Sequence, residues 1–281
     1  MNLRKASAAA ATVLALSLTA TACGSGDSDS SSEGDGGGKK ITIGIKFDQP
    51  GIGLKTPDGS FKGFDVDVAT YVAKELGYEA KDIEWKETPS ADRETALARG
   101  DVKFIAASYS INDERKEKVD FAGPYLLAHQ DLLIRADDKG ISKGTDLNGK
   151  KLCSVTGSTS AQNVKDDFAP KAQLRQLPTY SECIDGLASG AVDALTTDDS
   201  ILAGYASQDQ NKGKFKLAGL SLSNENYGIG VKKGDTKLVE DINAALEKMV
   251  ADKAWDKAVT DNFGPADYKN EPAPKIGNIV S

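Results

Sequence analysis

Two serines and one arginine at fixed spacing form the pattern in this sequence best suited to binding a small anion. Residues 104–121 read F-I-A-A-S-Y-S-I-N-D-E-R-K-E-K-V-D-F, which contains Ser108, Ser110 and Arg115. An arginine offers a carboxylate two parallel charge-assisted hydrogen bonds, and nearby hydroxyls can complete the shell around it. The spacing therefore indicates carboxylate binding, with a solvated arginine on a charged helix as the alternative.

The elements around this pattern explain how it would be positioned. Residues 104–107 are an apolar run typical of a buried strand, and Asn112 can cap a short polar helix that carries Arg115. Strands at 41–46 and 83–88, each followed by a helix, come earlier in the chain. This β-α-β-α-β order predicts a parallel sheet with helices on both faces, and such sheets bind ligands beyond the carboxyl ends of their strands.

Charged residues at the expected helix starts allow more than one interpretation. Asp65 is expected to cap the helix at 65–76, and the Asp65-x-Asp67 spacing invites a metal interpretation. No further ligands follow at calcium-loop spacing, so we interpret both as helix-start acids. Arg93 is expected in the first turn of the next helix, 90–99, where a cation is mildly disfavoured. Such a placement marks either a ligand contact or exposure to water.

A second α/β unit begins after residue 130. The strand at 151–155 leads through T-G-S-T-S-A into a helix, which places Gly157, Ser158 and Thr159 at a helix N-terminus, a ready anion site. A later strand ends at Asp198, which is expected either to cap the helix at 200–207 or to contact a ligand. Tyr180 precedes the helix that lies between these two strands.

Composition and motifs argue against several function classes. The net charge of −7 and the lack of a basic or aromatic stripe argue against nucleic acid as a partner. The chain has one histidine, no G-x-S-x-G and no metal-ligand cluster, so no catalytic residue, metal or cofactor is predicted. The segment G-T-D-L-N-G-K-K resembles a P-loop but carries Lys151 instead of Ser or Thr and precedes a strand, so nucleotide binding is not predicted.

The N-terminal residues predict a membrane anchor. Residues 1–22 read as a signal peptide, because a cationic start precedes an apolar run too short for a stable membrane span. The sequence L-T-A-T-A-C-G resembles the lipobox of bacterial lipoproteins and predicts lipidation, such as palmitate, on Cys23, although Ala20 stands where Leu is usual. Residues 23–39 would be the lipidated cysteine and a flexible tether. We expect the protein on the outer face of a cell membrane, as in Gram-positive bacteria.

The two other cysteines are expected to form a disulfide. With Cys23 acylated, Cys153 and Cys183 remain in an oxidising compartment, where one bond between them is expected and two buried free thiols are the alternative. A loop of this size would stabilise the fold by about 3 kcal/mol.

Four segments together resemble the amino-acid-binding members of bacterial extracellular solute-binding family 3. They are G-F-D-V-D-V-A, S-x-S-x-x-x-x-R, V-D-F-A-G-P-Y and the G-S-T-S turn. The resemblance covers essentially all of 40–281, and I-K-F-D-Q-P-G-I-G-L-K is similar to the glutamate-binding lipoproteins of high-GC Gram-positive uptake systems. It implies an α/β, two-lobed periplasmic-binding-protein-like fold of type II, with the ligand cleft between lobes joined by two hinge strands. Lobe 1 would be 40–128 plus 226–281, and lobe 2 would be 129–225.

The resemblance also implies roles for individual residues. The position matching Arg115 binds the ligand α-carboxylate in the family, helped by those matching Ser110 and Thr159. The positions matching Ser108 and Asp198 take the α-ammonium group.

Specificity for the ligand side chain would come from other positions. Acidic-amino-acid binders of the family have basic residues at the positions of Lys46 and Arg93, and a polar ring at Tyr180. Two carboxylates and one ammonium would then describe glutamate or aspartate. The remaining candidate contacts are Ser158 and Gln49.

The expected mechanism is capture by closure of lobe 2 over a ligand held first by lobe 1. The closed form would dock on a membrane permease whose ATPase powers uptake, and the protein is expected to be a monomer. Three alternatives stay open: a binder of another polar amino acid such as glutamine, a sensor or adhesion module with the same cleft, and an enzyme.

Overall fold

The first three core strands of the chain are parallel, as the alternation of strands and helices predicts. The computed structural model describes residues 39–280. Strand β1 (Ile41–Ile45) pairs in parallel with both β5 (Ile83–Glu87) and β6 (Phe104–Ile105). Helices α1 (Phe64–Glu75) and α2 (Arg93–Arg99) make the two crossovers.

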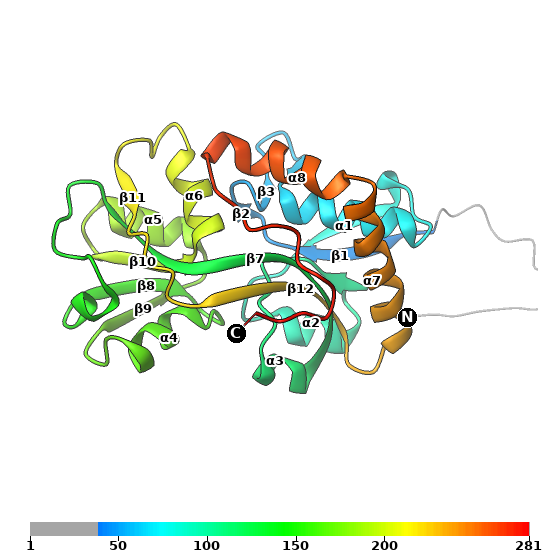
Figure 1. Ribbon diagram of the computed structural model, residues 1–281, viewed down its shortest axis with the longest axis horizontal. Coiled ribbons are helices and arrows are strands. Elements are labelled where there is room, and N and C mark those ends of the chain that lie inside the picture. Colours follow the sequence, from blue (N-terminus) through cyan, green and yellow to red (C-terminus); the bar gives the residue numbers. More distant parts are fainter. Residues whose placement is uncertain (1–38, 281) are drawn as a thin grey trace, which may run out of the picture. The chain divides into compact units, whose positions relative to one another are not determined.

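Two long antiparallel strands, β7 (Val119–Arg135) and β12 (Asn224–Lys232), join the two lobes (Figure 1). Strand β12 pairs with β6 on one side, and β7 pairs with β10 (Ala194–Asp198) on the other. The resulting strand order is β5-β1-β6-β12-β7-β10-β8-β9. The predicted two-lobed α/β fold with two connecting strands is therefore confirmed.

We call the part that carries β1, β5 and β6 lobe 1, and the part that carries β8, β9 and β10 lobe 2. The predicted lobe borders, between residues 128 and 129 and between 225 and 226, fall inside the continuous strands β7 and β12. Because both strands run through the predicted borders without a break, the exact limits stay a prediction.

Lobe 2 is a second sheet flanked by helices. Strand β8 (Lys151–Val155) pairs in parallel with β9 (Gln173–Leu177) and with β10, and β11 (Phe215–Leu217) pairs with β7. Its helices are α4 (Ser160–Asp167), α5 (Tyr180–Ala188) and α6 (Asp199–Ser207). Cys153 of β8 and Cys183 of α5 form a disulfide, which confirms the predicted pair.

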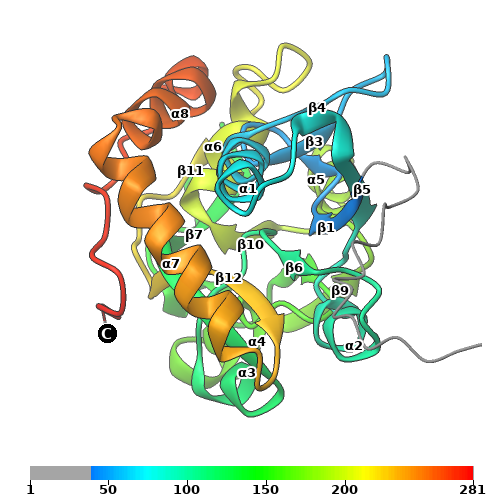
Figure 2. The same ribbon diagram turned by 90° about the vertical axis from the view of Figure 1, so that its right-hand side faces the viewer.

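The remaining elements complete lobe 1 and the connections. A small sheet contains β2 (Asp48–Gln49), β3 (Gly53–Lys55) and β4 (Phe61–Lys62), and α3 (Asp113–Lys118) precedes β7. Helices α7 (Thr236–Ala251) and α8 (Ala254–Phe263) pack on α1, and α7 also lies against β7 (Figure 2). The short helices are η1 (Ala80–Asp82), η2 (Gly144–Leu147) and η3 (Gly264–Ala266).

The core follows the periodicity of the sequence, whereas several helix starts differ from expectation. The apolar face of helix α7 buries Leu238, Ile242, Ala245, Leu246 and Met249. Asn112 caps α3 as predicted, accepting from the Arg115 N–H at 2.9 Å. The prediction that Asp65 caps α1 is wrong, because Gly63 occupies the cap position and Asp65 is buried inside the first turn. Helix α2 starts at Arg93 instead of residue 90.

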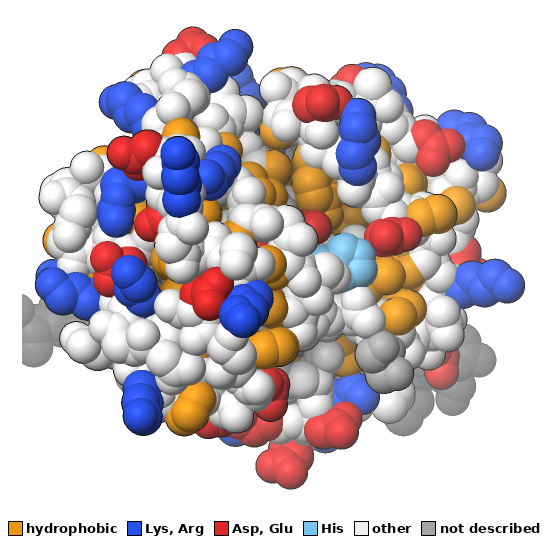
Figure 3. Space-filling view, turned by 60° about the vertical axis from the view of Figure 1, so that its left-hand side comes forward, with side chains coloured by type: hydrophobic (Ala, Val, Ile, Leu, Met, Phe, Trp, Pro, Cys, Tyr) orange, Lys and Arg blue, Asp and Glu red, His pale blue; other side chains and the backbone are white. Residues whose placement is uncertain are grey.

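The surface of the described part carries charges of both signs (Figure 3). Acidic and basic side chains are interspersed on the face in Figure 3, which is typical of a solvated protein surface. Within residues 39–280 no helix has both the length and the apolar character needed to cross a bilayer. The predicted signal peptide, Cys23 and the tether up to residue 38 lie outside the described residues.

Candidate functional site

Asp65 supports the backbone at the end of β6. Ser108 has a φ of 43°, a left-handed conformation that side-chain-bearing residues adopt rarely. The Asp65 carboxylate accepts from the Ser108 N–H at 2.7 Å and from the Tyr125 hydroxyl at 2.6 Å. Burial raises the pKa of Asp65 to about 6, although both hydrogen bonds act in the opposite direction. Asp65 therefore holds Ser108 in place from inside lobe 1.

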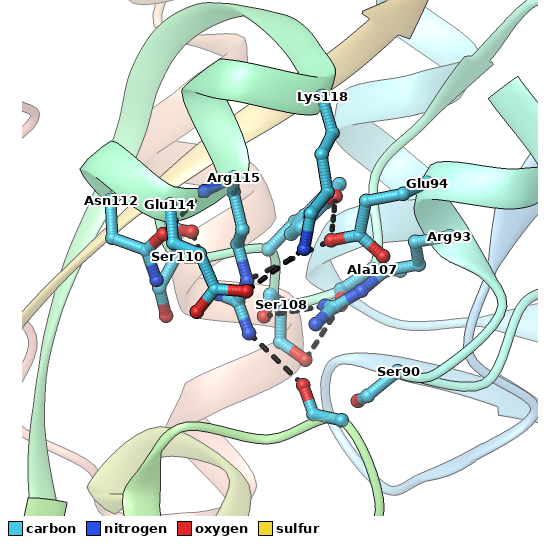
Figure 4. Close-up of polar contacts among 12 residues, drawn as sticks. Ser90, Arg93, Glu94, Ala107, Ser108, Ser110, Asn112, Glu114, Arg115 and Lys118 are labelled. Carbon is cyan, nitrogen blue, oxygen red and sulfur yellow. Dashed lines mark hydrogen bonds and ion pairs between the residues drawn. The ribbon is translucent and has the colours of Figure 1, made fainter. Parts of the chain in front are cut away.

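Arg115 is buried in α3, and its guanidinium reaches the other lobe. Its Nη1 donates to the carbonyl oxygen of Ser110 at 2.8 Å, and its Nη2 donates to that of Gly157, in lobe 2, at 3.2 Å. Its Nε lies 4.0 Å from the Glu94 carboxylate. Figure 4 shows the guanidinium groups of Arg115 and Arg93 on either side of Ser108. Arg115 is therefore not the solvated surface arginine of the alternative interpretation.

The ring of Tyr109 brings two guanidinium groups together. The Cζ of Arg93 lies 4.0 Å from the ring centroid and that of Arg115 lies 5.2 Å from it. The Tyr109 hydroxyl donates to Glu94 at 2.6 Å, which fixes the ring. Cation–π attraction to an aromatic ring favours such a pair despite the repulsion between like charges. Arg93 Nη1 also donates to the Ala107 carbonyl at 3.0 Å, whereas its buried Nε has no partner within the described residues.

Lys46 completes a group of three buried cations, Lys46, Arg93 and Arg115, which we call the cationic cluster. Their exposed fractions are 5%, 2% and 6%. Burial lowers the pKa of Lys46 to about 7, and the charges of Arg93 and Arg115 act in the same direction. Burial, followed by the charge of Arg115, lowers the pKa of Arg93 to about 10. Within residues 39–280 no carboxylate lies at ion-pair distance from Lys46 or Arg93.

Lobe 2 places hydroxyl groups opposite this cluster. The Tyr180 hydroxyl accepts from Thr197 Oγ1 at 2.6 Å and donates to Ser158 Oγ at 3.5 Å. Burial and the nearby Asp198 raise the pKa of Tyr180 to about 12, while the charge of Arg93 acts against them. Tyr180 therefore lies close enough to Arg93 of the cationic cluster for an electrostatic interaction. Thr159, next to Ser158, is half-buried at the cap position of α4.

Asp198 is a buried acid of lobe 2. Asp198 occupies the cap position of α6, as one of the two interpretations predicted, but its side chain makes no capping hydrogen bond and accepts from the Tyr227 hydroxyl instead. Burial and the nearby Glu225 raise its pKa well above the ordinary value, while Arg115 acts in the opposite direction. A buried acid that lacks a bound cation suits an incoming ammonium group.

Gln49 adds an amide to the same region from lobe 1. Its side chain is fully buried, and its Oε1 accepts from Ser108 Oγ at 3.1 Å. Its Nε2 has no hydrogen-bond partner within the described residues. Because a buried N–H group without a partner is costly, this amide is suited to donate to a ligand.

The lobes contact each other in this structure. The Asp48 carboxylate of lobe 1 accepts from the N–H of Tyr180 at 3.0 Å and from the Tyr205 hydroxyl at 3.1 Å. Tyr180 is the first residue of α5. Gly204 of α6 packs directly against lobe 1, since a Cβ there would lie 2.0 Å from the Pro50 carbonyl oxygen. The structure therefore represents a closed arrangement.

The predicted site residues lie where the lobes meet. Hydrogen bonds and ring contacts link nine of them, directly or through an adjacent residue: Arg115, Ser108, Ser110, Thr159, Asp198, Arg93, Tyr180, Ser158 and Gln49. The tenth, Lys46, is connected to them through its electrostatic interaction with Arg93 and Arg115. Their roles toward a ligand stay predictions. Sequence reasoning missed Asp48, Tyr109 and Tyr227, and it misinterpreted Asp65 as a helix cap. Only Tyr109 gave a usable signal, as an aromatic residue between the two serines.

Comparison with known proteins gives the geometry a family context. The family model described as "Bacterial extracellular solute-binding proteins, family 3" matches residues 41–265. The glutamate-binding protein GluB of Corynebacterium efficiens is 51% identical over 234 residues, which are 80% of this chain and 79% of that protein. The ABC transporter glutamine-binding protein GlnH of Bacillus subtilis is 40% identical over 219 residues, 78% of this chain and 79% of that protein.

A solved structure supports the fold independently. An ancestral arginine-binding protein bound to glutamine is 36% identical, has a TM-score of 0.75, and is matched over 80% of this chain and 98% of that chain.

Proposed function

The chain belongs to family 3 of the bacterial extracellular solute-binding proteins, and we propose that it is the substrate-binding component of an ABC importer for glutamate, with aspartate as a second ligand. The high identity to a glutamate-binding protein supports the ligand class. The observation that carries the proposal is the cationic cluster, which lies close to the buried Asp198 of lobe 2.

Charge balance favours a ligand with two carboxylates. Desolvating a charge without a partner costs several kcal/mol, so a buried cation needs an anion beside it. A ligand with one carboxylate would compensate Arg115 and leave Lys46 and Arg93 without a counter-charge. A second carboxylate would supply it, while the ammonium group of the same ligand would compensate Asp198.

In the proposed complex each end of the ligand has its own group of residues. Arg115, Ser110 and Thr159 bind the α-carboxylate, whereas Ser108 and Asp198 bind the α-ammonium group. The side-chain carboxylate lies at Lys46 and Arg93, with Tyr180 beside it. Two further residues, Ser158 and Gln49, complete the shell.

We further propose that the protein binds its ligand without transforming it and delivers it to a permease with an associated ATPase. In this proposal residues 1–22 are removed as a signal peptide, Cys23 carries the lipid, and the binding unit acts as a monomer on the extracellular face of the membrane. Mass spectrometry of the membrane-extracted protein tests the anchor: an unmodified Cys23 would contradict it.

Calorimetric titration with glutamate, aspartate, glutamine and arginine tests the ligand assignment. We expect glutamate to bind most tightly and arginine, which would add a fourth cation, not to bind. A preference for glutamine or arginine would overturn the assignment. Lys46→Ala should weaken the acidic ligands selectively, whereas Arg115→Ala should abolish binding of every amino acid.

A further inference from the structure

Lys46 lies among charged groups from five neighbouring elements. Two are cations, Arg93 of α2 and Arg115 of α3, and three are acids, Asp48 of β2, Asp65 of α1 and Glu87 of β5. Its Nζ donates a hydrogen bond to Ser90 Oγ at 2.8 Å.

None of the three acids is placed to neutralise Lys46. The Asp48 carboxylate accepts from Tyr180 and Tyr205 of lobe 2, and the Asp65 carboxylate accepts from Ser108 and Tyr125. Glu87 is exposed to solvent. In this closed arrangement the ammonium form of Lys46 therefore has no close counter-ion among the described residues.

The three positive charges of the cationic cluster repel one another, and only Lys46 can relieve this repulsion by losing its charge. A guanidinium stays protonated in proteins, whereas a buried lysine shifts its pKa readily. Burial and the two arginines together lower the pKa of Lys46 to about 7, which agrees with this geometry. A carboxylate placed beside Nζ would reverse the effect, because an opposite charge favours the ammonium form.

We propose that Lys46 takes up a proton from solvent when an acidic amino acid binds, so that capture of the side-chain carboxylate and protonation of Nζ are one coupled event. This inference rests on the proposed function and goes beyond it. The proton joins the lone pair of the Nζ amine, and the resulting ammonium is held by the ligand carboxylate. The protonation state of Lys46 then determines specificity for glutamate over glutamine. The neutral amide of glutamine carries no charge that would stabilise the ammonium form of Lys46.

Two consequences follow from the linkage between proton uptake and binding. Binding that takes up a proton weakens with rising pH, so the Kd for glutamate should rise above the pH at which free Lys46 titrates, by up to about tenfold per pH unit for one proton. Below that pH the contribution of Lys46 should be flat. The preference for glutamate over glutamine should therefore fall as the pH rises.

Calorimetry of glutamate binding at pH 8 in buffers of different ionisation enthalpy measures the number of protons taken up. The matched control is Lys46→Arg, which keeps the positive charge but does not titrate. Subtracting the two values also removes any proton released at Asp198 when the ammonium group arrives. We expect the wild-type protein to take up roughly one proton more than the variant. Equal proton numbers would overturn the inference.

A second measurement covers the case in which Lys46→Arg does not bind. In the ligand-free wild-type protein labelled with 13Cε-lysine, the Lys46 signal should titrate near neutral pH and stop doing so when glutamate is added. The Lys46 signal is assigned as the one that is missing from the spectrum of the Lys46→Met variant. A protein in which no lysine titrates below pH 9 would contradict the inference. Failure of glutamate to bind at any pH would instead remove the proposed function.

Discussion

Arg115 of lobe 1 donates a hydrogen bond to the carbonyl oxygen of Gly157 of lobe 2, at 3.2 Å. The same guanidinium is held in its own lobe by the Ser110 carbonyl at 2.8 Å. The residue proposed to bind the α-carboxylate thus also bridges the lobes. In the proposed complex the same side chain would therefore bind the ligand and make one of the contacts between the closed lobes.

The first prediction concerns this guanidinium. Arg115→Lys keeps the positive charge but removes the planar pair of donors, so we expect binding of every amino acid ligand to weaken at least about tenfold, the effect of losing one hydrogen bond to a charged group. Calorimetry with glutamate and aspartate measures the change. Lys116→Ala removes an exposed cation from the same helix and should leave affinity unaltered. Near-normal affinity in Arg115→Lys would contradict the role of Arg115.

The second prediction separates closure from folding. Gly204 lies inside α6, where alanine favours the helix by about 1 kcal/mol. Its new methyl group would meet the Pro50 carbonyl only when the lobes are closed, since a Cβ would lie 2.0 Å from that oxygen. Gly204→Ala should therefore keep or raise the melting temperature and weaken ligand binding.

The control for this experiment lies in the same lobe. Gly186 is a helical residue of α5, and a Cβ there would make only an ordinary contact with Val192 at 3.5 Å. Gly186→Ala should therefore bind ligand normally. Small-angle scattering should show ligand-induced compaction in Gly186→Ala and not in Gly204→Ala. Full compaction of Gly204→Ala would show that the closed arrangement differs from the one described.

The third prediction concerns Asp48, which connects lobe 1 to the start of a lobe 2 helix. Asp48→Ala removes the carboxylate that accepts from the Tyr180 N–H, whereas the Tyr205 hydroxyl keeps the backbone carbonyl of residue 48 as an acceptor. Losing one hydrogen bond to a charged group costs roughly 1.5 to 3 kcal/mol. All ligands should lose affinity by a similar factor, measured by calorimetry. Asp58→Ala, whose carboxylate bonds within its own turn, should not affect binding. A loss of affinity confined to acidic ligands would instead mean that Asp48 acts through the charge of Lys46.

Residues placed by local rules were predicted better from the sequence than residues that hold the site in place through distant hydrogen bonds. Arg115 and Asn112 are three residues apart, so local capping rules were enough to place them. Asp65 was misinterpreted because its partners, Ser108 and Tyr125, are 43 and 60 residues away. Local propensity carries no information about such distant hydrogen bonds, which depend on how the elements pack.

The same limit explains the other omissions. Asp48 meets Tyr180 across 132 residues of chain, and only when the lobes are closed. Arg93 was singled out by its unfavourable position at a helix start, and its burial rules out exposure to water as the reason, but its stacking on Tyr109 required the fold. The burial of three cations together could not be read from spacing.

The fourth prediction concerns the Cys153–Cys183 disulfide, which closes a loop with a sequence separation of 30. Reduction should lower the free energy of unfolding by about 3 to 4 kcal/mol, because the unfolded chain regains entropy. Urea unfolding with and without a phosphine reductant measures this change. The double variant Cys153→Ala/Cys183→Ala should not respond to the reductant. An unchanged wild-type midpoint, or equal thiol counts in the unfolded chain before and after reduction, would contradict the prediction.

The most direct test of the cationic cluster as a receptor for two carboxylates is a crystal structure of the protein with glutamate. We expect the α-carboxylate at Arg115, the ammonium group at Asp198, and the side-chain carboxylate in contact with both Lys46 and Arg93. A bound glutamate whose side-chain carboxylate points away from Lys46 and Arg93 would contradict the account.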